Sequence, residues 1–252
     1  MSDTVVIDSQ DGVCHLTLNR PEKKNAFSSE QWSAFTDALL AAQEDNAVRV
    51  VVMSGAGGNF SSGQDLSAFM DATEGEEHPF GRCARTVCAF DKPLLAAVNG
   101  IAVGGGATLS FHADVIYVGE SLRMRLPFAN LGLVPEFASS YQLQAMIGSR
   151  RAAELFYTAE WIDADRAVET GIATAQYKDE DLLKMTLSKA EEIAQWPVNS
   201  LRETKRCLKL AHTAGLSAAL EVEDAAMMRQ AGSAENIEAI TAFMEKRKPN
   251  FS

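Results

Sequence analysis

The sequence predicts an α/β core followed by a helical C-terminal region. Short β-branched apolar runs alternate with glycine-rich turns and helical patterns up to about residue 135, as in folds that alternate strands with helices. From Ala138 onward the apolar spacing is helical almost throughout. The 252 residues are near the upper size for one hydrophobic core, so we expect one large domain with a smaller appendage.

Several strands are expected in the first half of the chain. Residues 48–53 form a β-branched run bounded by glycines, which is typical of a strand buried on both faces. Residues 93–98 and 114–118 have the same character, and a looser alternation at 13–19 predicts an earlier strand. Between the later two strands, residues 104–109 predict a junction from a glycine-rich loop to a helix.

Helices are expected between these strands and after them along the chain. Ser28 and Gln31 fit a capping box, and Trp32, Phe35 and Leu39 then recur at helical spacing. In the second half we expect helical segments at residues 141–147, 152–157, 181–195, 200–214, 218–230 and 237–246, with a short strand at 171–173.

Composition excludes several classes of function. A net charge of −11 argues against nucleic-acid binding through a broad basic surface. The four cysteines lack the spacing of a disulfide framework or a zinc site, and the four histidines are dispersed, so we expect reduced thiols and no metal. The polar N-terminus does not resemble a signal peptide, and no stretch approaches twenty apolar residues. These features predict a soluble, cytoplasmic protein without a membrane partner.

Two glycine-rich segments invite a nucleotide-binding interpretation and do not fit it. Residues 58–63 have the glycine spacing of a P-loop, but Gln64 and Asp65 follow in place of Lys and Ser or Thr. Residues 100–106 follow a predicted strand but lack the G-x-G-x-x-G spacing of a dinucleotide-binding turn. Two interpretations remain: close packing of backbone segments, or exposed N–H groups at a helix start that stabilise a developing negative charge.

Five sequence blocks occur in a characteristic order. They are Leu-Asn-Arg-Pro…Asn-Ala-Phe at 18–27, Phe-Ser-Ser-Gly-Gln-Asp-Leu at 60–66, Lys-Pro…Ala-Val-Asn-Gly…Gly-Gly-Gly at 92–106, the run at 114–119, and Phe-Met-Glu-Lys-Arg-Lys at 243–248. This pattern resembles the crotonase (enoyl-CoA hydratase/isomerase) superfamily over nearly the whole chain. The resemblance implies a spiral of ββα repeats in a core of residues 1–195. It also implies that residues 196–252 form a helical oligomerisation region of a homotrimer or of a hexamer built as a dimer of trimers.

The resemblance also implies the positions of the reacting groups. The backbone N–H groups of Gln64 and Gly105 would form an oxyanion hole for the thioester oxygen of an acyl-CoA. Ser62, Asp65 and Leu66 would lie along the coenzyme A moiety, although Asp65 is equally suited to stabilising its own loop.

Two basic clusters are candidates for the phosphates of coenzyme A. Lys24 belongs to the first, near the N-terminal block, and Lys246 belongs to the second, near the C-terminus. The alternative interpretation is that both are solvated runs of charge.

One carboxylate distinguishes the subgroups of the superfamily. Hydratases carry two glutamates, at the positions that Thr108 and Phe128 occupy in this chain, and neither residue can act as an acid or a base at neutral pH. Glu136 instead lies in a Pro-Glu…Ser-Ser-Tyr segment that resembles the block of peroxisomal-type Δ3,Δ2-enoyl-CoA isomerases. Glu136 is therefore the candidate proton shuttle, and Phe128 a candidate wall of the acyl site. The alternative for Glu136 is a solvated acid at a helix start.

The resemblance thus implies an enzyme that moves a double bond of an acyl-CoA from the β,γ to the α,β position. Such a reaction would need no metal and no cofactor besides the coenzyme A thioester that is its substrate. A hydratase or another acyl-CoA lyase of the same superfamily is the first alternative. A non-catalytic acyl-CoA-binding protein and a dinucleotide-dependent enzyme are alternatives from other classes.

Overall fold

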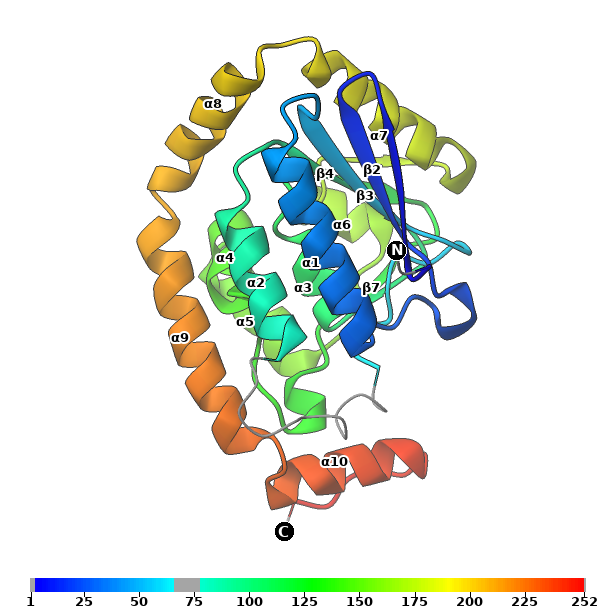
Figure 1. Ribbon diagram of the computed structural model, residues 1–252. Helices are drawn as coiled ribbons and strands as arrows, with labels where there is room; N and C mark the ends of the chain where they lie inside the picture. The colour runs from blue at the N-terminus through cyan, green and yellow to red at the C-terminus, as the bar shows by residue number, and fades with distance from the viewer. Residues whose placement is uncertain (1–2, 66–77, 252) are drawn as a thin grey trace.

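The fold is known from a computed structural model, which describes residues 3–65 and 78–251. In this part of the chain, strands and helices alternate before a C-terminal series of helices (Figure 1). The strands are β1 (Val5–Gln10), β2 (Val13–Leu18), β3 (Val50–Gly55), β4 (Leu94–Val98), β5 (Ile101–Val103), β6 (Val115–Gly119), β7 (Arg123–Arg125) and β8 (Ala175–Tyr177).

The helices include those expected from the sequence and two more, at residues 79–89 and 164–170, that the sequence analysis did not predict. They are α1 (Ser29–Glu44), α2 (Pro79–Ala89), α3 (Gly105–Ser110), α4 (Ser139–Ile147), α5 (Ser149–Thr158), α6 (Ala164–Thr170), α7 (Asp179–Ala194), α8 (Val198–Leu210), α9 (Thr213–Gln230) and α10 (Ala234–Met244), with short 3-10 turns at Pro21–Lys23 and Ala129–Leu131. The α/β fold class is therefore confirmed.

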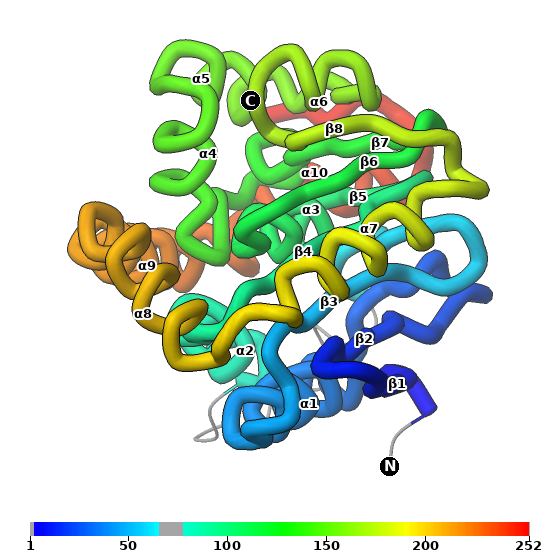
Figure 2. The backbone as a smooth tube through the Cα atoms, turned by 90° about the horizontal axis from the view of Figure 1, so that it is seen from above, coloured from blue at the N-terminus to red at the C-terminus, as the bar shows by residue number. Residues whose placement is uncertain are grey.

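Six of these strands form one sheet in the order β1-β2-β3-β4-β6-β8, and β5 pairs with β7 beside it (Figure 2). All neighbouring strands are parallel except β1 and β2. Those two form a hairpin whose turn residues, Asp11 and Gly12, both have positive φ angles (52° and 87°). An Asp-Gly pair suits such a turn, but the sequence analysis did not use this signal and missed β1.

The parallel strands are covered on both faces. Val50 and Val52 of β3 face α7 and pack with Ala190, whereas Val51 and Met53 face the larger core under α1 and α2. All four β3 residues are fully buried, as predicted for a strand enclosed on both sides. The main core therefore lies between the sheet and the helices α1 to α3.

Some local expectations need correction. Ser28 caps α1 by accepting a hydrogen bond from the Gln31 N–H (3.2 Å), but the Gln31 side chain donates to the Thr4 carbonyl instead of completing a capping box. The strand expected at 171–173 is wrong, because Gly171 ends α6 with φ 90° and the strand β8 begins at Ala175. The helix expected at 200–214 ends earlier, and α9 already begins at Thr213.

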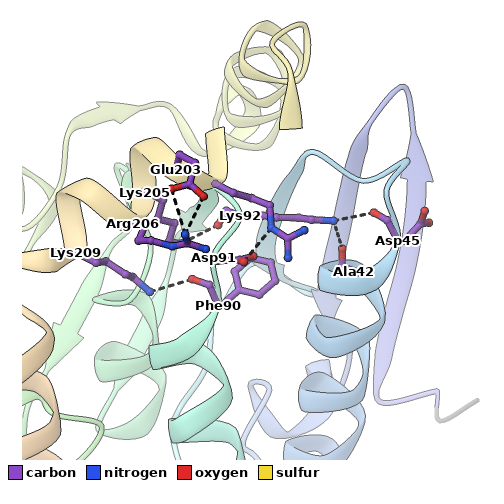
Figure 3. A network of polar contacts seen from close by, with 10 residues as sticks. Ala42, Asp45, Phe90, Asp91, Lys92, Glu203, Lys205, Arg206 and Lys209 are labelled. Carbon is purple, nitrogen blue, oxygen red and sulfur yellow. Dashed lines mark hydrogen bonds and ion pairs between the residues drawn. The ribbon is translucent and has the colours of Figure 1, made fainter. Parts of the chain in front are cut away.

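Buried lysines hold α8 against the core (Figure 3). The Lys205 Nζ donates to the Lys92 carbonyl and to the Asp114 carboxylate, both at 2.7 Å, and the Lys205 side chain is only 4% exposed. Lys92 is itself buried, and its Nζ donates to the Ala42 and Asp45 carbonyls at 2.6 and 2.7 Å. Lys205 and Lys92 thus connect α8 to the end of α1 through two successive sets of hydrogen bonds.

Beyond α7 the chain runs along one side of the core through α8 and α9 and ends with α10 at the bottom of the view in Figure 1. Several large apolar side chains on these helices are exposed, among them Leu208, Leu210, Val222, Met228 and Phe243. The division into residues 1–195 and 196–252, with the second part as an oligomerisation region, stays a prediction. No helix of the described residues is both long enough and apolar enough to cross a membrane.

Replacing Lys205 by Met should destabilise the protein by about 1–3 kcal/mol, because the Lys92 carbonyl and Asp114 would lose a charged donor. Urea unfolding monitored by circular dichroism measures this loss. Arg206→Met is the matched control on the same helix, since its ion pair with Glu203 is exposed and such pairs contribute at most about 1 kcal/mol. Equal effects of the two substitutions would contradict a structural role for Lys205.

Candidate active site

The candidate site lies where two glycine-bearing loops meet. A Cβ atom on Gly63 would lie 2.5 Å from the Val103 carbonyl oxygen and 3.3 Å from the Gly105 nitrogen, and Gly63 has φ +88°. Only glycine fits such an approach at this backbone conformation. A parallel bridge between Ser61 and Ala102 aligns the two loops just before the contact.

A buried asparagine anchors the first loop. The Asn25 Nδ2 donates to the carbonyls of Ala56 (2.9 Å) and Asn59 (2.7 Å), and its Oδ1 accepts from the Arg20 N–H (2.9 Å). Its carbonyl accepts a further hydrogen bond from the Ser61 hydroxyl at 2.8 Å. These hydrogen bonds connect the sequence block at residues 18–27 to the block at residues 60–66, so the two motifs form one structural unit.

Two N–H groups at the contact have no acceptor among residues 3–65 and 78–251. Gly105 is the first residue of α3, where N–H groups lack partners within the helix. Within residues 3–65 and 78–251, no oxygen accepts a hydrogen bond from the N–H of Gly105 or of Gln64. The Gln64 side chain is fixed by a 2.7 Å bond from the Trp32 Nε1–H, and its backbone pairs with Phe27. The site therefore presents two immobilised donors side by side.

The Glu136 carboxyl lies close to Gly105. Its Oε1 is 2.9 Å from the position that a Cβ atom on Gly105 would take. The residue is half-buried, and burial of the carboxyl raises its pKa to about 8, with a smaller contribution from the negative charge of Glu223. A carboxyl with such a pKa can both accept and return a proton near neutral pH.

The turn after Glu136 has an unusual backbone. Phe137 and Ala138 both have positive φ angles (61° and 55°), which non-glycine residues rarely adopt. The His112 Nε2 donates to the Phe137 carbonyl at 2.8 Å, and its Nδ1 accepts from the Gln142 amide at 2.8 Å. Burial lowers the pKa of His112 to about 3, so the ring is neutral and serves to hold the turn.

Aromatic rings pack together beside Gly105. Trp32 stacks on Phe27 with ring centroids 3.6 Å apart, and its edge lies 3.6 Å from the Cβ position of Gly105. Phe80 of α2 meets Trp32 and Phe137 edge to face, at 5.4 and 4.7 Å. The rings make this side of the site apolar, and burial is the main cause of the raised pKa of Glu136.

Comparisons with known proteins identify the family of this chain. The sequence profile described as enoyl-CoA hydratase/isomerase matches residues 8–252. The chain belongs to the enoyl-CoA hydratase/isomerase family. A crystal structure of an enoyl-CoA hydratase/isomerase from Pseudoalteromonas atlantica T6c superimposes with a TM-score of 0.96 at 33% identity, covering 99% of this chain and 100% of the other.

Relatives within the family differ in the reactions that their names give. The 1,2-epoxyphenylacetyl-CoA isomerase of Escherichia coli K12 is 30% identical over 100% of this chain and 99% of its own. Enoyl-CoA delta isomerase 2 of Rattus norvegicus is 33% identical over 98% of this chain, which spans 65% of the rat protein. Hydratases match at 28% and 30% identity over nearly the whole chain.

Neither position that carries a glutamate in hydratases of the family offers an acid here. The Thr108 hydroxyl is buried and donates to the Gly104 carbonyl at 3.2 Å, within the first turn of α3. Phe128 is 5% exposed and packs toward Phe156 of α5, with ring centroids 6.3 Å apart. Phe128 is thus part of the main core, and its contact with a substrate stays a prediction.

The residues expected near coenzyme A lie partly together. The Ser62 N–H donates to the Lys24 carbonyl at 2.9 Å, so these two residues are neighbours at the surface. Asp65 forms an ion pair with Arg20 at 3.1 Å and thereby stabilises its loop, which was the alternative interpretation. Leu66 lies outside the described residues.

Lys246 lies elsewhere, exposed just after α10. Its backbone has φ 54°, and its N–H donates to the Phe243 carbonyl at 3.2 Å. Its proximity to a ligand of the same or a neighbouring subunit stays a prediction.

Outside this site, the described residues include surface hollows but no metal-binding cluster. No group of three or more His, Cys, Asp or Glu side chains in residues 3–65 and 78–251 is arranged to hold a metal ion. A surface hollow of about 420 Å³ lies between α5 and α6, away from the candidate site. Its charged rim includes Arg151, Glu154 and Arg166, and the Arg166 guanidinium lies 3.9 Å from the Glu154 carboxylate.

Sequence reasoning missed two residues that shape the site. The spacing of Trp32 predicts a helix, which is observed as α1, but its bond to Gln64 joins positions 32 residues apart. Glu223 lies on α9, 85 and 83 residues after Ala138 and Ser140, whose N–H groups it accepts. Neither contact leaves a local pattern in the sequence.

Glu136→Gln should stabilise the protein at alkaline pH. Folding raises the pKa of this acid from 4.5 to about 8. Such an acid ionises more readily in the unfolded chain, so it favours the unfolded state as the pH rises above 4.5. The destabilisation is fully present only above the pKa of the folded protein. Removing the acid should therefore stabilise the fold by about 2–4 kcal/mol near pH 9 and by little below about pH 4. Urea unfolding of both proteins at the two pH values tests this, and a gain independent of pH would contradict it.

Proposed function

We propose that the chain is an enoyl-CoA isomerase, which converts 3-enoyl-CoA thioesters to the conjugated 2-enoyl-CoA. The observation that carries the proposal is the half-buried carboxyl of Glu136 beside Gly105, with its Oε1 2.9 Å from the glycine Cβ position. A double-bond shift needs one group that removes and returns a proton. This arrangement supplies one such group beside two free N–H donors.

The proposed reaction balances with Glu136 alone. The carboxylate removes a proton from the α-carbon, which is acidified by both the thioester and the neighbouring alkene. The electron pair left behind forms a dienolate with its charge on the thioester oxygen. Glu136 then returns the proton to the γ-carbon, and the double bond forms between the α- and β-carbons. No metal or further cofactor is required, and coenzyme A enters only as part of the substrate.

The N–H groups of Gln64 and Gly105 are the proposed oxyanion hole. Fixed main-chain donors stabilise charge that grows on an oxygen in the transition state, and one such donor typically contributes about 10²–10³ in rate. Because the donors belong to the backbone, loop positions determine their geometry. The close approach of Gly63 to Val103 and Gly105 supports this role.

Hydration is the alternative that the relatives keep open, since hydratases match the chain as well as isomerases do. A hydratase must hold and activate a water molecule. The Thr108 hydroxyl is engaged with the Gly104 carbonyl and Phe128 is a core side chain, so neither position supports a second acid. Glu136 alone suits a reaction in which no water is added.

The substrate would be held by its coenzyme A portion. Ser62 and Lys24, which are adjacent at the surface, together with Leu66 are the proposed contacts of this portion. Lys246 is proposed to reach a phosphate, in the same subunit or across a trimer interface formed by the exposed apolar side chains of α8 to α10.

Purified protein should convert a 3-enoyl-CoA to its conjugated isomer, and Glu136→Gln should lower kcat by about 10²–10⁴-fold because the proton shuttle is removed. Absorbance of the conjugated thioester measures the reaction. Glu191→Gln, an exposed acid on α7, is the control and should behave as the wild type. Full activity of Glu136→Gln would overturn the mechanism.

Hydration of crotonyl-CoA without isomerase activity would favour the hydratase, and binding of acyl-CoA without turnover would favour a binding protein.

Gly105→Ala should lower kcat by about 10²-fold or more, because its methyl group would meet the Glu136 Oε1 at 2.9 Å and the Trp32 ring at 3.6 Å. Thermal unfolding should change little, since the nearest atom belongs to a side chain that can rotate. Calorimetry with coenzyme A tests whether the distal binding contacts persist. An active Gly105→Ala variant would contradict the proposed position of the oxyanion hole.

A further inference from the structure

The N-terminal end of α4 is capped by an acid from a distant helix. The Glu223 carboxylate of α9 accepts hydrogen bonds from the N–H groups of Ala138 (2.7 Å) and Ser140 (2.8 Å). Glu223 is only 5% exposed. This cap begins two residues after Glu136, at the turn whose residues Phe137 and Ala138 have left-handed backbone conformations.

The turn is held from two sides. His112 donates to the Phe137 carbonyl at 2.8 Å, and Glu223 accepts from the next N–H along the chain. Two consecutive non-glycine residues with positive φ angles are costly, and such a conformation persists only when its surroundings enforce it. The direction in which the preceding residue, Glu136, projects its carboxyl depends on this turn.

A capping role alone does not account for a second buried acid. Serine, threonine or asparagine satisfies a helix start without a charge. Glu223 instead places a carboxylate close enough to Glu136 to raise its pKa further, beyond the effect of burial. Burial also raises the pKa of Glu223, while its hydrogen bonds at Ala138 and Ser140 oppose that change.

We propose that Glu223 is a positioning residue for the proton shuttle: its two backbone hydrogen bonds fix the turn that aims the Glu136 carboxyl at the Gly105 loop. This inference rests on the proposed function of Glu136. It predicts that α9, although it belongs to the C-terminal helical region, sets both the direction and the proton affinity of the reacting group.

The other titratable groups near this pair come from several elements. They are Cys88 on α2, His112 after α3, Tyr141 on α4 with its partner His212, Lys209 on α8, and Asp224 on α9 itself. His112 stays neutral because burial lowers its pKa to about 3. Burial and the charge of Lys205 lower the pKa of Lys209 to about 8, so the titration of Glu136 needs a readout specific to carboxyl groups.

The test compares Glu223→Ala and Glu223→Gln with Glu221→Gln, an exposed acid on the same helix. With a 3-enoyl-CoA substrate, Glu223→Ala should lower kcat by about 10²-fold while KM changes little, because the shuttle is misaimed and the coenzyme A contacts remain. Glu223→Gln keeps the size and one acceptor oxygen, so it decides the question if the alanine variant does not fold. The midpoint of its kcat/KM profile should shift to lower pH, because a negative neighbour of Glu136 is lost. The proposal would be overturned if kcat of the Glu223 variants and the midpoint of the Glu223→Gln pH profile were equal to those of Glu221→Gln.

Two readouts do not depend on turnover and separate this proposal from the isomerase function. Infrared difference spectra against Glu136→Gln isolate the carboxyl titration of Glu136, whose midpoint should fall in Glu223→Gln. Amide hydrogen exchange at Ala138 and Ser140 should become faster in Glu223→Ala. If the wild type shows no isomerase activity but both changes occur, the proposed function fails and the positioning by Glu223 stands. If neither changes, the role of Glu223 is disproved whatever the activity.

Discussion

The contact between Gly63 and the Val103–Gly105 backbone is the constraint on which the rest of the site depends. Two loops from separate strand–helix connections approach so closely that a single methyl group would separate them. Close packing at this point brings two N–H groups together and leaves no room for side chains between them. The hydrogen bonds of Asn25 and the Ser61–Ala102 bridge stabilise the contact from the protein interior. The Asn25 side chain and the Ser61 hydroxyl thus hydrogen-bond to backbone carbonyls of this region.

The Glu136 carboxyl is maintained at a thermodynamic cost. An acid that is shielded from water and close to a second carboxylate is destabilised in its charged form. The same environment makes its proton affinity suitable for proton transfer near neutral pH. The left-handed turn at residues 137–138 adds backbone strain at the same place. The free-energy cost of ionising Glu136 and its suitability for proton transfer therefore have the same physical cause, which is the transfer of its carboxyl from water into the protein.

The C-terminal helices contribute to the core of the protein as well as to its surface. Lys205 on α8 is buried against Asp114 and the Lys92 carbonyl, and Glu223 on α9 is buried against the start of α4. Each charged side chain reaches a backbone group that the core leaves without a partner. Removal of either helix would uncover buried polar groups, which makes the helical region an integral part of the fold in energetic terms.

The sequence by itself determined the α/β class and the buried strands, because strand burial and glycine positions follow from local chemistry, and the resemblance of five sequence blocks indicated the family. It also placed Glu136 correctly beside the glycine-rich turn, through the resemblance of its segment. It missed the β1 hairpin, despite the Asp11-Gly12 signal, and misplaced the strand near Gly171, because an isolated glycine also suits a helix end. Only the tertiary structure decided that Trp32 holds Gln64, that Asp65 pairs with Arg20, and that Glu223 caps the turn beside Glu136. Those contacts join residues 32 to 85 positions apart, and sequence periodicity carries no information about partners at such distances.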